Sequence, residues 1–244
     1  LWLEVNVKRD GKIYNQRYEQ GKVCYDLKEA GKCRKNDTGT KVSFFPDAEI
    51  FEKIYFKADA IKSRLHETAY LNPLLTIIFE DKRKEVTEHV EYHEPDGIIG
   101  FVKDLNNNLE VLHDVIYFKG ESEGIEVEAA FQYTSEFHEN IMGFCNNIYN
   151  SEGGAHLTGF KTAFTTIINS YARELGILKE KDANFNGTDV RNGMTAVISI
   201  KHPDPRFEGQ TKTKLDNQDA NRATAKVTSD EVPLFFDKNL ETLK

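Results

Sequence analysis

The chain has 244 residues, of which 39% are hydrophobic and 30% are charged, and its formal net charge at pH 7 is -8. These values are typical of a soluble globular protein with one large domain or two ordinary ones. The acidic balance argues against a surface covered with DNA-binding charge, although it leaves room for a local basic patch.

Membrane and disulfide signals are weak. The apolar runs are far shorter than the roughly 20 residues of a membrane helix, and no signal-peptide pattern opens the chain. Three cysteines, Cys24, Cys33 and Cys145, are widely spaced and odd in number, which argues against a disulfide framework and a CxxC zinc site. We therefore expect a soluble, cytoplasmic protein. Because LWLEVNVKRDG begins inside a strand pattern without an initiator methionine, we also expect a piece of a longer chain.

The first part of the chain alternates apolar and polar residues, as β-strands do. Residues 3–8 and 13–18 alternate on either side of the dipeptide Asp10-Gly11, which predicts a β-hairpin. The segment DTGTKVSFFPD then predicts a strand at residues 42–45 that the following proline ends.

The next segment predicts a helix followed by a strand. Apolar residues recur with a 3.6-residue period from Phe56 to Tyr70, so we expect a helix that ends before Asn72-Pro73. The run Leu74–Phe79 is then expected to be a buried strand. The sequence EDKRKEVTEHVEYHEPDG that follows is highly charged, and we expect a domain boundary at residue 90.

The second part of the chain predicts a mixture of strands and helices. We expect helices over 98–105 and 157–178, strands over 126–133, 140–147 and 194–200, and a further helix from Asn217 onward. One face of the first of these strands carries Val127, Ala129, Phe131 and Tyr133. Pro233 must start, end or kink an element. Because strands and helices do not alternate regularly, we predict an α+β fold in two sheets rather than a doubly wound parallel fold.

Two common catalytic motifs do not occur in the sequence. It contains no HExxH motif and no Walker-type loop. His89 and His93 would share one face of a helix and could bind a metal there, but the charged residues around them favour a solvated segment. We therefore predict no metal site within the chain.

The segment NSEGGAHLTGFK precedes the second long predicted helix. Gly153 and Gly154 permit a left-handed conformation or a close backbone approach, and His156 with Thr158 could cap the helix. A tight strand-to-helix turn is the interpretation that these residues favour. Lys161, one turn into the helix, is by default a solvated lysine.

The segment FEGQTKTKLDNQ, residues 207–218, places two lysines beside a glutamine. Both residue types can donate hydrogen bonds to a phosphate, and a nearby helix N-terminus would strengthen an anion site. A run such as QTKTK is more often a solvated loop. Residue types alone therefore leave a solvated loop and a phosphate site open at Gln210 and Lys212.

Five longer segments follow one another in order: DTGTKVSFFPD, RLHETAYLNP, GIEVEAAFQY, NNIYNSEGGAHLTGFKTAF and NGMTAVISIKHPDPRFEGQTKTKL. Together, between residues 1 and 216, they resemble the ATPase subunit of bacterial type IIA topoisomerases. The last segment favours the B subunit of DNA gyrase over the B subunit of topoisomerase IV. The fourth speaks against a MutL-like repair ATPase.

The resemblance implies two domains. Residues 1–90 would be the C-terminal portion of an α/β sandwich, the ATPase domain of the gyrase, chaperone, histidine-kinase and MutL (GHKL) superfamily. Residues 91–244 would be a ribosomal-protein-like α+β transducer domain with a left-handed crossover. Asp216 stands where the family usually has glycine, and residues 218–244 fit the family's helix only loosely.

The resemblance also implies site residues. Gln210 and Lys212 match the pair that reaches the γ-phosphate of ATP, with Lys212 as the catalytic residue. Thr40 matches a threonine near the adenine-side water network, and Lys161 matches a basic position that faces the DNA cavity. The family's general base, magnesium ligand, adenine-binding aspartate and glycine-rich lid precede the matched segments. The 244 residues alone are therefore expected not to hydrolyse ATP.

The implied function is to couple ATP binding and hydrolysis to DNA strand passage and supercoiling, with ATP and Mg²⁺ as cofactors. The implied partners are the A subunit of gyrase in an A2B2 complex, double-stranded DNA, and a second B subunit in an ATP-dependent homodimer, without a membrane. Two alternatives stay open. One is the B subunit of topoisomerase IV, which decatenates DNA, and the other is a non-catalytic nucleic-acid-binding or structural module.

Overall fold

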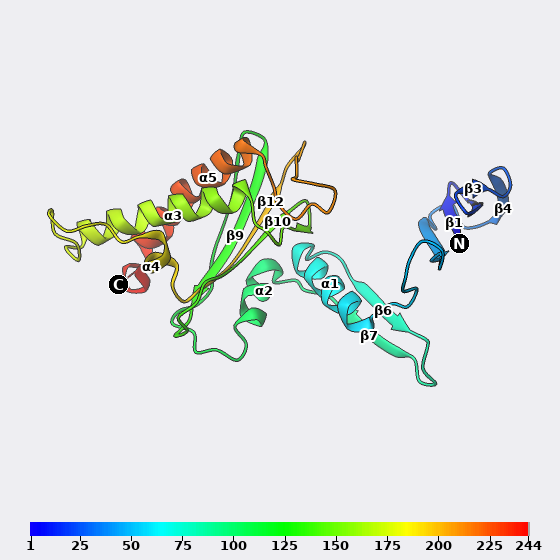
Figure 1. The fold of residues 1–244 in the computed structure, drawn as a ribbon, viewed down its shortest axis with the longest axis horizontal. Helices are drawn as coiled ribbons and strands as arrows, with labels where there is room; N and C mark the ends of the chain where they lie inside the picture. Colours follow the sequence, from blue (N-terminus) through cyan, green and yellow to red (C-terminus); the bar gives the residue numbers. More distant parts are fainter. Residues whose placement is uncertain (244) are drawn as a thin grey trace. The chain divides into compact units, whose positions relative to one another are not determined.

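The computed structural model describes residues 1–243, which divide into two compact units between Ile61 and Lys62 (Figure 1). The first unit contains one sheet and the second contains two, and helix α1 (Ala58–Leu71) spans the division. The boundary expected at residue 90 would separate the ATPase domain from the transducer domain of the family, and it stays a prediction. Among the described residues, every helix is too short or too polar to cross a membrane.

The first unit is built on a five-stranded sheet. Its strands are β1 (Trp2–Arg9), β2 (Lys12–Glu19), β3 (Lys22–Val23), β4 (Lys28–Lys32) and β5 (Gly39–Phe45), in the order β3-β2-β1-β5 with β4 paired to β2. Between β1 and β2, Asp10 and Gly11 have φ angles of 53° and 79°, the left-handed conformation of a tight hairpin turn. The predicted hairpin and the predicted strand at residues 42–45 are confirmed.

The second unit begins with α1, a two-stranded sheet of β6 (Ile77–Asp81) and β7 (Glu88–Tyr92), and α2 (Gly97–Leu105). These bounds confirm the first two predicted helices. The buried strand expected from residue 74 is wrong in part, because β6 begins at Ile77 and Leu74 is 97% exposed. Its partner β7 comes from the charged segment, where no strand was predicted. This small sheet is also one more than the two sheets expected.

The larger sheet of the second unit has five strands in the order β11-β10-β12-β9-β8. They are β8 (Ile116–Ser122), β9 (Ile125–Tyr133), β10 (Asn140–Cys145), β11 (Ile148–Tyr149) and β12 (Met194–Lys201). β10 and β12 run parallel, and the other pairs are antiparallel. The three predicted strands are confirmed, although β10 ends earlier than expected. A parallel pair needs a crossover connection, and its left-handedness stays a prediction.

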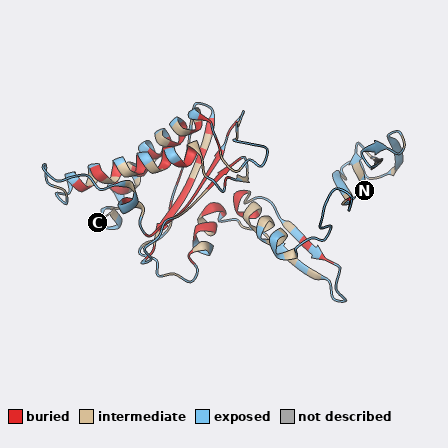
Figure 2. Cartoon of the chain, viewed as in Figure 1, coloured by how far each residue is buried: buried red, intermediate tan, exposed pale blue. Residues whose placement is uncertain are grey.

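Helices cover both faces of this sheet (Figure 2). α3 (Ala155–Glu174) and α5 (Gln218–Lys238) pack on one face, where Val127, Ala129 and Phe131 of β9 are buried. α2 packs on the other face, against Ala130 and Val197. The burial of Val127, Ala129 and Phe131 together confirms that these residues share one face, although Ala130 shows that the opposite face of β9 is buried as well. Short helices α4 (Gly187–Arg191) and α6 (Leu240–Leu243) follow α3 and α5.

The two long helices differ from the prediction in detail. α3 ends at Glu174, earlier than expected, and Gly176 then turns the chain with a φ of 73°. α5 continues through Pro233, which neither starts nor ends it. The Tyr171 hydroxyl on α3 donates to the Asp237 carboxylate at 2.5 Å and lies 3.2 Å from the Pro233 carbonyl oxygen. These contacts join α3 to α5 at the proline.

Gly159 lies where α3 packs against α5, and a Cβ atom there would overlap the backbone carbonyl of Asn221. We expect Gly159→Ala to lower the free energy of unfolding by about 1–3 kcal/mol, in spite of the better helix propensity of alanine. Urea unfolding followed by far-ultraviolet circular dichroism measures this change. The exposed control Thr162→Ala should keep the wild-type midpoint. An unchanged midpoint for Gly159→Ala would contradict the close packing.

Candidate functional site

The connection between β12 and α5, residues 202–217, is here called the β12–α5 loop. Backbone hydrogen bonds of 2.9 Å join its two arms at two levels, Glu208 with Lys214 and Asp216 with Arg206. The loop predicted at this place is therefore a hairpin-like projection, and residues 209–212 form its tip.

Gln210 and Lys212 lie together at this tip, and both are exposed. The chain turns there through left-handed conformations at Gly209, with a φ of 80°, and at Lys212, with a φ of 57°. The Lys212 ammonium lies 5.7 Å from the centroid of the Phe207 ring, within cation–π range. No carboxylate within residues 1–243 forms an ion pair with Lys212. Its ammonium is therefore available to an anion.

Asn150 fixes the backbone of the tip. Its Nδ2 donates to the Lys212 carbonyl at 2.8 Å, and the residue is only 2% exposed. Close by, the Glu152 amide donates to the Thr213 carbonyl at 2.9 Å. Sequence reasoning missed Asn150, because one asparagine at the end of a strand carries no signal of a partner so distant in sequence.

Gly153 and Gly154 form the predicted strand-to-helix turn before α3. Gly154 has a φ of 143°, and a Cβ atom on it would lie 2.5 Å from the Leu215 carbonyl oxygen. That oxygen accepts from the Ala155 amide at 2.9 Å, and the Leu215 amide donates to the Gly153 carbonyl at 3.2 Å. The returning arm of the loop therefore packs directly on the start of α3, which a side chain at residue 154 would prevent.

The predicted capping role of His156 is wrong. Its imidazole is fully buried, and neither ring nitrogen has a hydrogen-bond partner among the described residues. It packs over Gly143 of β10, where a Cβ atom would lie 2.5 Å from Nε2. Burial lowers the pKa of His156 to about 4. The residue that caps α3 is Gly154, and Thr158 donates to its carbonyl at 3.3 Å.

Lys161 is half-buried and paired, not a solvated lysine as its sequence position indicated. Its ammonium binds the Glu139 carboxylate, which the Arg191 guanidinium also binds at 2.7 Å. Burial by itself would raise the pKa of the Glu139 carboxyl, but the hydrogen bonds from Lys161 and Arg191 outweigh burial and the pKa is lowered. Glu139 and Arg191 are far from Lys161 in the sequence, so no local pattern could reveal them.

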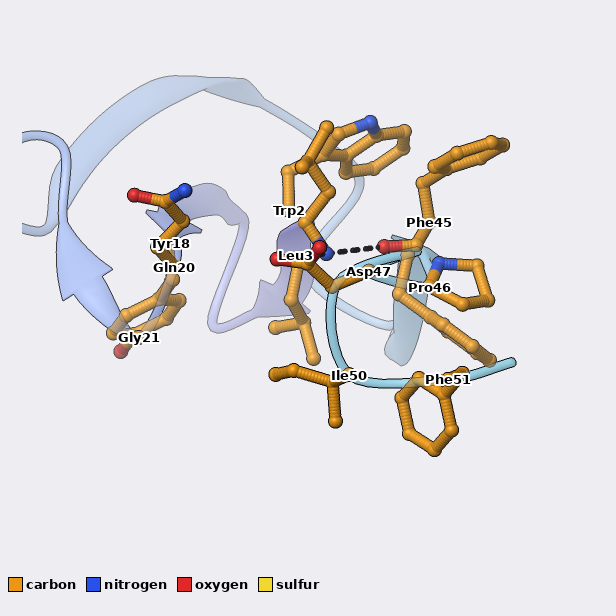
Figure 3. A pocket seen from close by; sticks show the side chains of 12 residues that line it. Trp2, Leu3, Tyr18, Gln20, Gly21, Phe45, Pro46, Asp47, Ile50 and Phe51 are labelled. Atoms are coloured by element: carbon orange, nitrogen blue, oxygen red, sulfur yellow. Dashed lines mark hydrogen bonds and ion pairs between the residues drawn. The ribbon is translucent and has the colours of Figure 1, made fainter. Parts of the chain in front are cut away.

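Thr40 belongs to the first unit, where it lies on β5 opposite Val7 of β1 and is exposed. A hollow of about 440 Å³ in that unit has an apolar lining that includes Trp2, Phe45 and Phe51 (Figure 3). Thr40 does not line this hollow. The part of Thr40 in nucleotide binding therefore stays a prediction.

His89 and His93 lie on and just after strand β7, not on a helix. His89 Nδ1 lies 3.4 Å from the Glu80 carboxylate, and His93 Nδ1 lies 3.2 Å from the Leu75 carbonyl oxygen. Four residues along a strand span about 13 Å. That separation is too large for one metal ion to bind both rings.

Comparisons with known proteins place this loop and sheet in a family. A family model described as DNA gyrase B matches residues 97–244, more than half of the chain. The chain belongs to the DNA gyrase B family.

The relatives of this chain include B subunits of both DNA gyrase and DNA topoisomerase 4. In Streptococcus pneumoniae serotype 4 (strain ATCC BAA-334 / TIGR4), the B subunit of DNA gyrase is 45% identical over 244 residues, 99% of this chain and 37% of that protein. The B subunit of DNA topoisomerase 4 from the same strain is 44% identical over 243 residues, 98% of this chain and 37% of that protein. The chain thus spans just over a third of these relatives, and identity does not separate the two kinds.

A solved member of the DNA gyrase B family has the same fold. The 43K ATPase domain of Thermus thermophilus gyrase B, in complex with an aminocoumarin, aligns with a TM-score of 0.83 and 32% identity over 99% of this chain and 65% of that chain. The resemblance inferred from the five motifs and the predicted α+β, GHKL-type fold are confirmed.

The burial of His156 as a neutral ring predicts a pH dependence of stability. Its pKa is about 4 in the folded chain against an ordinary value of 6.5, so the unfolded state takes up the proton first as the pH falls. The contribution of the neutral His156 ring to the free energy of unfolding is fully present above about pH 6.5. The free energy of unfolding falls by up to roughly 3 kcal/mol as the pH drops to about 4. Urea unfolding across this range should show a smaller pH slope for His156→Leu.

The exposed His138 supplies the control for this experiment. His138→Gln removes one imidazole without touching the core, and it should keep the slope of the wild-type protein. A wild-type slope in His156→Leu would mean that the buried ring does not carry this pH dependence.

Proposed function

We propose that this chain is part of the B subunit of a DNA gyrase, a type II topoisomerase that couples ATP binding and hydrolysis to DNA strand passage and supercoiling. The main support is the β12–α5 loop, which presents Gln210 and Lys212 together at an exposed tip in a member of the DNA gyrase B family. The use of ATP agrees with a solved neighbour that is described as an ATPase domain.

Gln210 and Lys212 are proposed to bind the γ-phosphate of ATP. An ammonium group and an amide N–H both suit phosphate oxygens as donors. The hydrogen bond from Asn150 holds the Lys212 backbone before any ligand binds, which reduces the entropy lost on binding. Exposed donors on a fixed backbone therefore fit phosphate recognition better than donors on a freely moving loop.

This contact would depend on the state of the nucleotide. Gln210 and Lys212 gain it only while the γ-phosphate is present, so loss of that phosphate shifts the conformational equilibrium of the loop. The positive charge of Lys212 also offsets the negative charge on the phosphoryl group during transfer. One lysine would thus serve both hydrolysis and the sensing of its outcome.

Most of the ATP site is proposed to come from family motifs that these 244 residues do not contain, including the general base and the Mg²⁺ ligand. Thr40 is proposed to contribute to the water network on the adenine side. In this scheme residues 1–90 are the C-terminal portion of the GHKL ATPase domain. Residues 91–244 are the transducer that brings Lys212 to the nucleotide.

Lys161 is proposed to face double-stranded DNA in a cavity of a dimer of two B subunits. It shares the Glu139 carboxylate with Arg191 of α4, so two positive charges stand against one negative charge in this cluster of three residues. A local excess of positive charge attracts the DNA backbone even on an acidic protein. The proposed protein partners are a second B subunit, in an ATP-dependent homodimer, and the A subunit of gyrase, in a cytoplasmic A2B2 complex.

The B subunit of topoisomerase IV is the second candidate, because its identity to this chain is 44% against 45% for the gyrase relative from the same strain. The two functions differ in their products. The assembled enzyme should introduce negative supercoils into relaxed circular DNA if it is a gyrase. Decatenation without supercoiling would instead identify a topoisomerase IV.

Lys212→Ala should reduce the ATP turnover of the full-length protein by at least about a hundredfold, because charge stabilisation at the transferred phosphoryl group is lost. Nucleotide affinity should change much less, since the adenine and the other phosphates keep their contacts. Steady-state hydrolysis gives the turnover, and equilibrium titration with a non-hydrolysable ATP analogue gives the affinity.

Lys214 provides a matched control two residues away in the same loop. Its ammonium pairs with the Glu208 carboxylate at 2.9 Å and is thereby occupied. Lys214→Ala should therefore keep turnover within about threefold of wild type, since exposed ion pairs contribute little. Wild-type hydrolysis by Lys212→Ala would refute the proposed role of the tip.

The 244-residue chain by itself is expected not to hydrolyse ATP and to bind DNA weakly. Phosphate release and DNA binding at several salt concentrations, measured on the isolated chain, test this expectation. Tight DNA binding that falls steeply with salt would favour a nucleic-acid-binding module instead. ATP hydrolysis by the isolated chain would refute the assignment of the general base to other segments.

A further inference from the structure

The turn between β10 and β11 consists of Asn146 and Asn147, which have φ angles of 50° and 64°. Glycine adopts this left-handed conformation without strain, and asparagine tolerates it. The turn geometry alone would therefore be satisfied by glycine. The two asparagine side chains make hydrogen bonds to two different parts of the second unit, so their contacts serve something besides the turn.

Asn146 pairs with the first residue of the β12–α5 loop. Its Oδ1 accepts from the His202 amide at 2.8 Å, and its Nδ2 donates to the His202 carbonyl at 2.9 Å. This pairing extends the parallel ladder of β10 and β12 beyond its last strand pair, Cys145 with Ile200. The side-chain amide thus continues the pairing at the point where β12 ends and the loop begins.

His202 in turn contacts residues at both ends of the β12–α5 loop. It is 5% exposed, and its Nδ1 accepts from the Asp204 amide at 3.0 Å, which makes Nε2 the protonated nitrogen of the neutral ring. Nε2 lies 3.1 Å from the Asp219 carboxylate at the start of α5, close enough for attraction although outside hydrogen-bond geometry. On the returning arm, Asn217 accepts from the Arg206 amide at 2.5 Å. Both ends of the loop are therefore held.

Asn147 pairs with α1. The Arg64 guanidinium donates to the Asn147 carbonyl at 2.7 Å, and Asn147 Nδ2 donates to Asn72 Oδ1 at 3.0 Å. Arg64 is itself oriented by Glu67 at 2.8 Å. One residue of the turn therefore contacts α1, and the residue before it contacts the loop.

We propose that Asn146 and Asn147 are positioning residues that couple α1 to the β12–α5 loop and thereby place Lys212. A shift of α1 that keeps Arg64 and Asn72 paired carries the turn with it, and the turn then displaces His202. The inference rests on the proposed role of Lys212 at the γ-phosphate. It adds a route by which the part proposed as the ATPase domain, which contains α1, and the part proposed as the transducer respond to each other.

Glycine substitution tests this without breaking the turn. In the full-length protein, Asn146→Gly should lower kcat for ATP hydrolysis about tenfold while KM for ATP stays within about threefold. Asn147→Gly removes the bond to Asn72 but keeps the Arg64 bond to the backbone carbonyl, so it should act in the same direction with a smaller effect. The control is Glu123→Gly in the β8–β9 turn, which has a φ of 54° and, within residues 1–243, makes an exposed ion pair with Arg222 as its one side-chain contact of this kind. This control should keep wild-type kcat.

A double-mutant cycle separates positioning from general loss of structure. If Asn146 acts through Lys212, Asn146→Gly should cause no further loss in the Lys212→Ala background, whereas independent effects multiply. Amide hydrogen exchange at Glu208 and Asp216 should also be faster in Asn146→Gly than in wild type. A wild-type kcat for Asn146→Gly, or a further loss in the double variant, would overturn the inference alone. Wild-type hydrolysis by Lys212→Ala would overturn the proposed function instead.

Discussion

Backbone contact between the start of α3 and the returning arm of the β12–α5 loop is the constraint on which the candidate site depends. Leu215 bonds to Gly153 through its amide and to Ala155 through its carbonyl, and Gly154 has no Cβ to keep the two segments apart. Leu215 is also 1% exposed within the main core. Helix, loop and core are therefore fixed to one another, and the tip that carries Lys212 takes its position from them.

At this end of the sheet, side-chain amides provide hydrogen-bond partners for backbone groups that have no backbone partner. Strands β10 and β12 end here, and backbone N–H and C=O groups beyond a strand end still need partners. An asparagine side chain offers one donor group and one acceptor, so it can replace a missing strand residue. Asn146 does this for His202, Asn150 for the Lys212 carbonyl and Asn217 for the Arg206 amide. The loop is thus ordered by polar contacts instead of by a core of its own.

Local patterns predicted most of the strands and helices because their causes are local. The turn at Asp10 and Gly11, the helical period before Asn72 and the alternation along β9 each depend on neighbours in sequence. Strand β7 was missed because its sequence is mostly polar and charged, and its pairing with β6 depends on residues outside the strand. His156 was expected as a cap and is buried instead. Gly143 has no Cβ atom, which leaves room for the imidazole ring, and no sequence pattern indicates that these two residues meet.

The sequence by itself determined the order of the elements, the glycine turn before α3 and, through five long motifs, the family. It also marked Gln210 and Lys212 as residues of interest, although residue types alone left them in a solvated loop as readily as at a phosphate. Only the tertiary structure decided that these two side chains stand on a fixed tip and that Lys161 shares a carboxylate with Arg191. The reason is that such contacts join residues distant in sequence, and their geometry exists only once the sheet and helices have packed.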